Sequence, residues 1–289
     1  MSSKIVPLLP RHTVYVEPFA GGAAVMFAKP WPPATNTHHY REVLNDIRGD
    51  VVNLYRVIGD PVKGPQLVRE LQATPYSRQA HKAARLIGDD ASDVARAWAF
   101  YTNVQQSFSN ILTGGWGTGV YGRNLAATWV RKVSRLPDYL DRMFGVHVEC
   151  DDALAVIERW DSPQTLFYCD PPYPGTDLGH YGGYMQDDFS ALCDLLDRCS
   201  GSFVLSCYDS PAAREHWERF EFSANASSSM AGKAGKGRDK SRAATAEELG
   251  NRKRTEVVWR ADRSDNARKE IQEVWRKWGW AKGQPMPGK

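Results

Sequence analysis

The sequence predicts a doubly wound α/β fold of the Rossmann-like kind, interrupted by a mostly helical insert. A short strand at residues 14–16 leads through a glycine turn into a helix, and a second strand follows at residues 42–44. This order is how a parallel sheet wound with helices begins. The alternation of strands and helices stops at about residue 61 and resumes at 146. Between those points apolar residues recur at helical spacing, which indicates an inserted subdomain.

Length and composition indicate a globular protein without a membrane segment or metal. The 289 residues, 42% of them hydrophobic and 25% charged, suffice for one large domain with a smaller insert. No apolar run approaches the roughly 18 residues that span a bilayer, and the N-terminus lacks a secretory signal. The five cysteines form no C-x-x-C pair. We therefore expect a reducing, cytoplasmic location and neither disulfides nor a structural zinc site.

A glycine turn follows the first predicted strand. It contains Glu17, Pro18, Phe19, Ala20, Gly21 and Gly22. Glycines between a strand and its helix let the backbone approach a ligand closely, and the helix start offers free N–H donors. Asp46 ends the second strand, where doubly wound folds place an acid on ribose hydroxyls. Two interpretations of Asp46 stay open, namely ribose binding and capping of the next helix.

The sequence Asp170-Pro171-Pro172-Tyr173 directly follows the apolar strand predicted at residues 165–169. Pro172 ends the strand and favours a rigid, extended turn. A carboxylate, a carbonyl and an aromatic ring are thereby held at the carboxyl edge of the sheet, where ligands bind in such folds. A plain β-turn with an exposed aromatic side chain is the alternative, and the upstream glycine turn disfavours it.

These groups suit methylation of an exocyclic amine, whose nitrogen is a poor nucleophile because its lone pair is delocalised into the ring. The Asp170 carboxylate and the Pro171 carbonyl can accept the two amine hydrogens and draw the nitrogen toward tetrahedral geometry. Tyr173 can stack on a base that has been flipped out of the helix. With an activated methyl sulfonium as donor, in-line positioning supplies most of the remaining catalysis.

In these motifs the chain resembles the Dam-like family of DNA adenine methylases. The resemblance extends from about Lys4 to Trp259 and rests on motifs in the family's order, at residues 16–22, 45–46, 152–153, 167–173, 205–209 and 254–259. It implies direct methyl transfer from S-adenosylmethionine to the amine of a flipped adenine in double-stranded DNA. The transfer would proceed with inversion, without a covalent enzyme intermediate and without a metal.

The resemblance also assigns parts of the chain. Residues 1–60 and 146–262 would form the methyltransferase core, and residues 61–145 the target-recognition insert. Residues 17–22 would hold the methionine part of the cofactor, Asp46 its ribose, and Asp152 with Ala153 its adenine. The family usually begins with an aromatic residue and a Gly-Gly-Lys turn. Here Ser2-Ser3-Lys4 stands at that place, with Lys4 matching the lysine, so we expect an incomplete lid over the cofactor.

Candidate DNA-reading residues lie near the end of the helix predicted at residues 91–104, where the family tends to place an aromatic, Asn-rich segment. Asn and Gln can pair bidentately with adenine in the major groove, and an apolar ring can wedge into a base step. The candidates are Asn103, Gln105, Gln106, Ser107, Phe108 and Asn110. A polar helix end and loop is the alternative.

A basic stretch lies late in the chain. The net charge is only +3, yet residues 232–254 contain eight basic residues and three acidic ones. We predict a flexible basic loop at residues 223–254 within the core, because this composition cannot bury a core. Lys233, Lys236 and Arg238 are candidate phosphate contacts, and a solvated loop is the alternative. Residues 263–289 are expected to form a C-terminal helix and tail, docked through one apolar face.

Two other functions stay open on the sequence alone. One changes the acceptor to the cytosine amine, an RNA base or a protein glutamine, although cytosine-amine enzymes more often carry Ser in place of Asp170 and glutamine methylases Asn. The other is a DNA-binding homologue with an impaired cofactor site, suggested by the short segment before Lys4. The sequence leaves open whether a restriction endonuclease partner exists. We expect association with the nucleoid through DNA, in a bacterial or phage setting.

Overall fold

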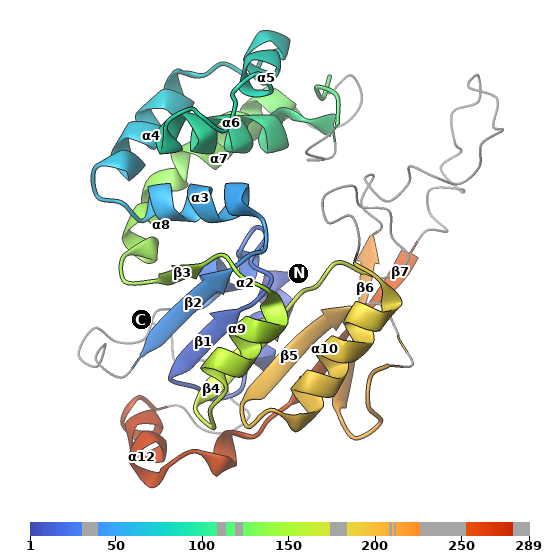
Figure 1. Ribbon diagram of the computed structural model, residues 1–289. Coiled ribbons are helices and arrows are strands. Elements are labelled where there is room, and N and C mark those ends of the chain that lie inside the picture. The colour runs from blue at the N-terminus through green and yellow to red at the C-terminus, as the bar shows by residue number, and fades with distance from the viewer. Residues whose placement is uncertain are drawn as a thin grey trace, which may run out of the picture.

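The computed structural model describes residues 1–30, 40–108, 114–118, 124–173, 184–207, 210, 212–225 and 253–279, with the backbone alone at 223–225 and 253–255. Within these residues the chain forms a seven-stranded sheet in the order β3-β2-β1-β4-β5-β7-β6 (Figure 1). The strands are β1 (Val14–Glu17), β2 (Arg41–Asn45), β3 (His147–Glu149), β4 (Thr165–Cys169), β5 (Ser202–Cys207), β6 (Glu218–Asn225) and β7 (Lys253–Ala261).

The pairing of these strands confirms the predicted doubly wound α/β fold. β3, β2, β1, β4 and β5 run parallel, whereas β7 lies antiparallel between β5 and β6. The chain winds outward through β2 and β3 on one side of β1, and through β5 on the far side of β4. Ligands of such sheets bind where the order reverses, beyond the carboxyl ends of the strands. Val16 of β1 pairs with Phe167 of β4, so the segments after β1 and β4 leave the sheet side by side.

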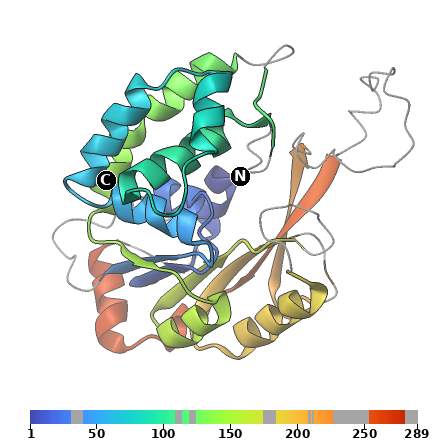
Figure 2. The same cartoon turned by 45° about the horizontal axis from the view of Figure 1, so that its top comes forward.

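Apolar layers cover both faces of the sheet, because side chains alternate along each strand. On β4, Phe167 and the adjacent Tyr168 enter different layers. The layer that contains Phe167 is covered by α9 and α10, and the layer that contains Tyr168 by α1, α2 and α12 (Figure 2). The bounds of these helices are α1 (Ser2–Ile5), α2 (Ala24–Ala28), α9 (Ala153–Trp160), α10 (Gln186–Arg198) and α12 (Lys269–Lys277).

A group of packed helices lies beyond the carboxyl ends of β1 and β2 (Figure 1), and we call it the helical layer. It consists of α3 (Gly49–Ile58), α4 (Lys63–Ala73), α5 (Arg78–Ala84), α6 (Asp93–Gln106), α7 (Leu125–Ser134) and α8 (Leu136–Met143). Arg142 of α8 anchors this layer to the sheet. Its guanidinium donates to the buried carboxylate of Glu42 on β2 at 2.7 Å and to the carbonyl of Met26 on α2 at 3.2 Å.

The elements that the sequence analysis did not predict include β6 and α10. β6 was missed, and with β7 it takes both ends of the predicted flexible loop at 223–254 into the sheet. Phe220 and Phe222, which pack against the core, alternate with exposed Arg219 and Glu221, and this period of two is typical of a half-buried strand. α10 was also missed, although its buried residues Phe189, Leu192, Cys193 and Leu196 recur at helical spacing.

The C-terminal helix docks as predicted, with Trp275 fully buried and its indole N–H donating to the carbonyl of His12 at 3.0 Å. The five cysteines are free thiols, of which Cys150 is exposed and the others are buried. Among the residues that the structure describes, no three His, Cys, Asp or Glu side chains gather closely enough to hold a metal ion. None of the described helices is long and apolar enough to cross a membrane.

Candidate active site

The turn between β1 and α2 is held in an unusual backbone conformation. Gly21 and Ala23 both have φ of +45°, in the left-handed region that glycine tolerates and alanine rarely adopts. The N–H of Gly21 donates to Asp46 Oδ2 at 2.9 Å, and the N–H of Ala23 donates to the Ala20 carbonyl at 2.6 Å. Strain at a residue such as Ala23 persists only where its surroundings impose it, and it is common at ligand sites.

Asp46 stabilises this turn through its hydrogen bond to Gly21 and does not line the pocket described below. It is buried, and its second oxygen accepts the N–H of Arg48 at 2.9 Å. Asn45, the preceding residue, donates its amide N–H to the carbonyls of Pro18 at 2.9 Å and Asp151 at 3.0 Å, while its own oxygen accepts the N–H of Asp151 at 2.9 Å. The ends of β1, β2 and β3 are therefore tied together by Asn45, which the sequence reasoning noticed only as part of a motif.

Glu17 ends β1 and is buried beneath the turn. Its Oε1 accepts the hydroxyl of Tyr15 at 2.7 Å and the N–H of Met26 at 2.8 Å, so it also caps the start of α2. Burial raises the pKa of Glu17 to about 8, although these two hydrogen bonds oppose the rise. A buried carboxyl of this kind is a candidate partner for a cationic ligand.

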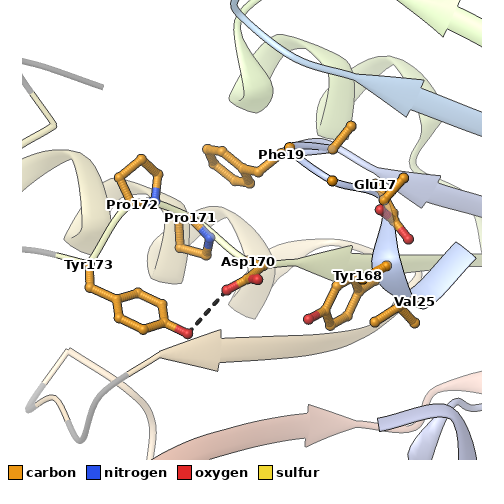
Figure 3. Close-up of a pocket in the computed structure, with 13 residues that line it drawn as sticks. Glu17, Phe19, Val25, Tyr168, Asp170, Pro171, Pro172 and Tyr173 are labelled. Carbon is orange, nitrogen blue, oxygen red and sulfur yellow. Dashed lines mark hydrogen bonds between the residues drawn. The ribbon is translucent and has the colours of Figure 1, made fainter. Parts of the chain in front are cut away.

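A pocket of about 360 Å³ lies between the glycine turn and the segment that follows β4 (Figure 3). The parallel pairing of β1 with β4 brings the two segments together. The pocket is lined by Glu17, Phe19, Ala20, Gly21, Gly22, Ala23, Ala24, Val25, Tyr168, Asp170, Pro171, Pro172 and Tyr173. It thus unites the predicted catalytic residues with five of the predicted cofactor residues.

The remaining predicted cofactor residues lie outside this pocket. Pro18 is buried within the turn, and Asp46 lies on the side of the turn away from the pocket. Asp152 is exposed and caps α9, accepting the N–H groups of Leu154 and Ala155 at 2.9 and 3.2 Å, and Ala153 is buried as the first residue of that helix. Lys4 lies on α1, its ammonium 5.4 Å from the ring centre of Phe222.

Asp170 faces the pocket and retains exposed surface. The surrounding protein nevertheless limits its hydration and raises the pKa of its carboxyl to about 7. The nearby Glu256 carboxylate adds to this rise, while the hydroxyl of Tyr173, which donates to Asp170 Oδ1 at 3.1 Å, opposes it. The carboxyl therefore changes its protonation state near neutral pH.

Ser206 and Glu256, to which the sequence reasoning gave no role, complete this part of the site. The hydroxyl of Ser206 donates to Glu256 Oε1 at 2.9 Å, and the hydroxyl of Tyr173 lies 3.3 Å from the same oxygen. Desolvation raises the pKa of Tyr173 far above its ordinary value, with Asp170 and Glu256 adding to the effect. The Tyr173 hydroxyl is therefore held as a neutral donor beside two acids.

Most of the predicted DNA-reading residues make contacts within the helical layer. Gln106 is buried, accepts the N–H of Ser77 at 3.1 Å and donates to the carbonyl of Pro75 at 3.1 Å. Ser107 is buried and donates to the carbonyl of Asn103 at 2.7 Å. The side-chain oxygen of Gln105 accepts a hydrogen bond from the ammonium of Lys132. Phe108 by contrast is 59% exposed. Asn110 lies outside the described residues, as do Lys233, Lys236 and Arg238.

A basic groove lies on α5, close to this segment. It has a volume of about 410 Å³ and is lined by Arg78, His81, Lys82, Arg85, Leu86 and Trp116. The guanidinium of Arg78 lies 4.9 Å from the ring centre of Trp116. Arg78, Lys82 and Arg85 recur at spacings that place them on one face of a helix. The sequence alone could have predicted this basic helix face from the spacing of the three residues, but the sequence analysis did not identify it.

The sequence matches a known protein family. The family model for D12 class N6 adenine-specific DNA methyltransferases matches residues 1–227.

The chain belongs to this family.

The methyltransferase is also 24% identical to the retron Ec67 DNA adenine methylase of Escherichia coli over 230 residues, which cover 75% of this chain and 76% of that relative. Among solved structures it matches an rRNA methyltransferase, aviRa from Streptomyces viridochromogenes, with 12% identity and a TM-score of 0.32 over 94% of this chain and 84% of that one. That structural similarity is too low to support a conclusion.

Family membership confirms the predicted activity. The protein is an adenine-specific DNA methyltransferase, its substrate is DNA, and the family implies S-adenosylmethionine as the methyl donor. The alternative acceptors, cytosine, RNA and glutamine, are not favoured by this match.

Proposed function

We propose that the pocket between β1 and β4 is where S-adenosylmethionine meets the flipped adenine. The observation that carries this proposal is the placement of the glycine turn and of Asp170–Tyr173 on opposite walls of one pocket (Figure 3). Its volume, about 360 Å³, falls within the range of small-molecule sites. Bound there, the cofactor would supply an activated methyl group on a sulfonium.

The residues on the turn side fit a cationic cofactor. Glu17 is a buried carboxyl whose pKa is raised to about 8, so a nearby ammonium or sulfonium charge would favour its ionised form. The left-handed Gly21 and Ala23 shape the backbone of the same wall. Asp46 and Asn45 would act from behind by fixing this turn, and Asp152 by fixing the start of α9.

On the opposite wall, Asp170 would accept one hydrogen of the adenine amine and the Pro171 carbonyl the other. The nitrogen lone pair would then be freed from the ring and available for attack on the methyl carbon. Pro172 would keep the segment extended after β4, and the ring of Tyr173 would hold the base. These roles need Asp170 as a carboxylate, because a protonated carboxyl has less acceptor capacity.

We further propose that double-stranded DNA lies along the helical layer, with residues 61–145 reading the target. Phe108 is the exposed apolar ring within the predicted reading segment, and the basic groove of α5 offers cations for phosphates. Lys233, Lys236 and Arg238 would add phosphate contacts from a separate part of the chain. A cytoplasmic location on the nucleoid remains a prediction from the sequence.

The decisive experiment combines Asp170→Ala with a methylation assay. Methyl transfer from labelled S-adenosylmethionine to DNA should be measured, with digestion to nucleosides to identify the methylated base. We expect methylated adenine with the wild-type protein and a loss of at least roughly 100-fold in the variant, because a preorganised acceptor is absent at a developing charge. Cofactor affinity should change by only a few-fold.

Asp170→Asn is the matched control, since it keeps the size of the side chain and removes the charge. An Asp170→Ala variant that keeps more than a tenth of the wild-type turnover would remove this residue from the mechanism.

A further inference from the structure

The hydroxyl of Tyr173 lies between two carboxylates. It is 3.1 Å from Asp170 Oδ1 and 3.3 Å from Glu256 Oε1. The Ser206 hydroxyl also lies 3.4 Å from this hydroxyl and donates its own proton to Glu256 at 2.9 Å. A phenol carries a single proton, so Tyr173 shares that proton between Asp170 and Glu256.

The sheet itself sets the position of Glu256. In the antiparallel pair of β5 and β7, Ser206 lies opposite Val258, and Glu256 lies two residues along β7 from that position. Residues in this diagonal relation share a face of the sheet and are within reach of each other. Ser206 is fully buried at the end of β5. Glu256 is thus an acceptor fixed by two paired strands, whereas Asp170 belongs to the segment that follows β4.

The roles proposed for Asp170 and Tyr173 compete for the same carboxylate. Asp170 must accept a hydrogen from the adenine amine, yet one of its oxygens faces the Tyr173 hydroxyl. An ionised carboxylate can accept more than one hydrogen, but Asp170 is the stronger acceptor for the amine when the Tyr173 hydroxyl donates elsewhere. The hydroxyl then needs another acceptor, because a largely buried donor without one costs free energy. Glu256 already lies at 3.3 Å, so the exchange requires rotation of an O–H bond and no displacement of the ring.

We propose that Glu256, anchored by Ser206, is a positioning residue that takes over the Tyr173 hydroxyl when the adenine amine occupies Asp170. The exchange frees Asp170 for the amine and keeps the Tyr173 ring in place against the base. Glu256 acts through Tyr173 and does not line the pocket. This inference rests on the proposed roles of Asp170 and Tyr173.

A double-mutant cycle between Glu256 and Tyr173 tests the proposal. Glu256→Leu removes the second acceptor, Glu256→Gln keeps an acceptor oxygen, and Tyr173→Phe removes the hydroxyl that needs one. The single-turnover methylation rate at saturating DNA and S-adenosylmethionine should fall roughly 10- to 100-fold in Glu256→Leu. In Glu256→Gln the rate should stay within about threefold of the wild-type rate. When Tyr173→Phe is already present, adding Glu256→Leu should cost less than about threefold more. The KM for S-adenosylmethionine should stay within about twofold throughout.

Three results would overturn the proposal: full activity of Glu256→Leu, an equal effect of Glu256→Leu with and without Tyr173→Phe, or a Gln variant as damaged as the Leu variant. Ser206→Ala provides a second route if Glu256→Leu does not fold. It loosens Glu256 without removing it, and we expect a smaller decrease that Tyr173→Phe again suppresses. Activity that survives Asp170→Ala would reject the proposed roles themselves, whereas an inactive Asp170→Ala with an additive cycle would reject only the role of Glu256.

Discussion

Glu17 and Asp170 are acids at opposite walls of one pocket, and the protein raises the pKa of both, to about 8 and about 7. Desolvation is the main cause in each case, and Asp170 also contributes to the rise at Glu17. Near neutral pH a substantial fraction of each carboxyl is therefore protonated before any ligand binds. Two consequences can be measured separately, one for catalysis and one for stability.

The first concerns the pH dependence of methylation. If Asp170 must be ionised to accept the adenine amine, kcat/KM should fall about tenfold per pH unit below roughly pH 7. An ordinary Asp would place this limb near pH 4. The measurement is kcat/KM for DNA between pH 5 and 9, with DNA affinity measured over the same range as the control. A rate that stays constant down to pH 5 would contradict the assignment of Asp170.

The second concerns Glu17 and the free energy of unfolding. Its pKa is higher in the folded protein than the ordinary 4.5, so the folded state binds the proton more tightly. The stability that this group contributes is therefore present at low pH and is lost as the pH rises from about 4.5 to about 8. Glu17→Gln keeps the oxygen that accepts from Tyr15 and Met26 and cannot ionise.

We therefore expect the melting temperature of Glu17→Gln, relative to wild type, to increase between pH 5 and pH 8 in the absence of cofactor. Glu273→Gln, at an exposed position on α12, is the matched control and should show the same difference at both pH values. If the difference in melting temperature between Glu17→Gln and wild type does not change with pH, then ionisation of Glu17 does not destabilise the folded protein.

At the scale of elements, α5 carries a basic face beside Trp116. We expect the triple variant Arg78→Ala, Lys82→Ala, Arg85→Ala to weaken DNA binding and to lower the slope of log affinity against log salt. Each phosphate contact that the variant removes should lower the slope by about 0.9. The methylated sequence should not change, because phosphate contacts carry no base information.

The control for α5 is the removal of three basic residues from α12, which docks on the sheet away from the helical layer (Figure 1). Lys269→Ala, Arg276→Ala and Lys277→Ala change the net charge by the same amount. If both triple variants lower the salt slope equally, α5 contributes only general charge. An altered recognition sequence in the α5 variant would mean that this face reads bases.

At the scale of the whole molecule, Arg142 joins the helical layer to the sheet through Glu42 and Met26. Glu42 is buried, and Lys29 and Arg142 together hold its pKa at about 2, against the effect of burial. Removing Arg142 leaves Glu42 paired with Lys29, so the loss is that of the charge-assisted hydrogen bonds that Arg142 donates to Glu42 and of its bond to the Met26 carbonyl. Arg142→Ala should therefore lower the free energy of unfolding by about 1.5–3 kcal/mol.

Chemical denaturation measures this change. The exposed pair of Arg198 and Glu158 gives the reference, since Arg198→Ala should cost no more than about 1 kcal/mol. Equal effects of the two substitutions would show that the contacts of Arg142 do not hold the helical layer on the sheet.

The sequence predicted the fold because its signals are local. Apolar runs mark the central strands, and the segment after β4 is conspicuous through Pro171 and Pro172. The roles of Asn45, Ser206 and Glu256 depend instead on which strands become neighbours. The antiparallel entry of β7 beside β5 brings Glu256 to Ser206, and no spacing within the chain encodes that contact. Gln106 and Ser107 are of residue types that often read bases. In the structure both are buried in the helical layer, where their side chains donate hydrogen bonds to backbone carbonyls.

The distribution of the thiols offers a practical handle. Cys150 is exposed and follows β3. Burial raises the pKa of Cys193 to about 12 and that of Cys199 to about 11, and it also raises the pKa of Cys169 well above its ordinary value. Thiolate is the reactive form, so a maleimide dye should label Cys150 in the native enzyme without any engineered substitution. Cys150 is next to Asp151, whose backbone forms hydrogen bonds with the side chain of Asn45. A fluorophore on Cys150 would report movements of the loop after β3 in real time. Because Asn45 connects this loop to the turn after β1, the signal would also report whether the loops around the pocket stay in place.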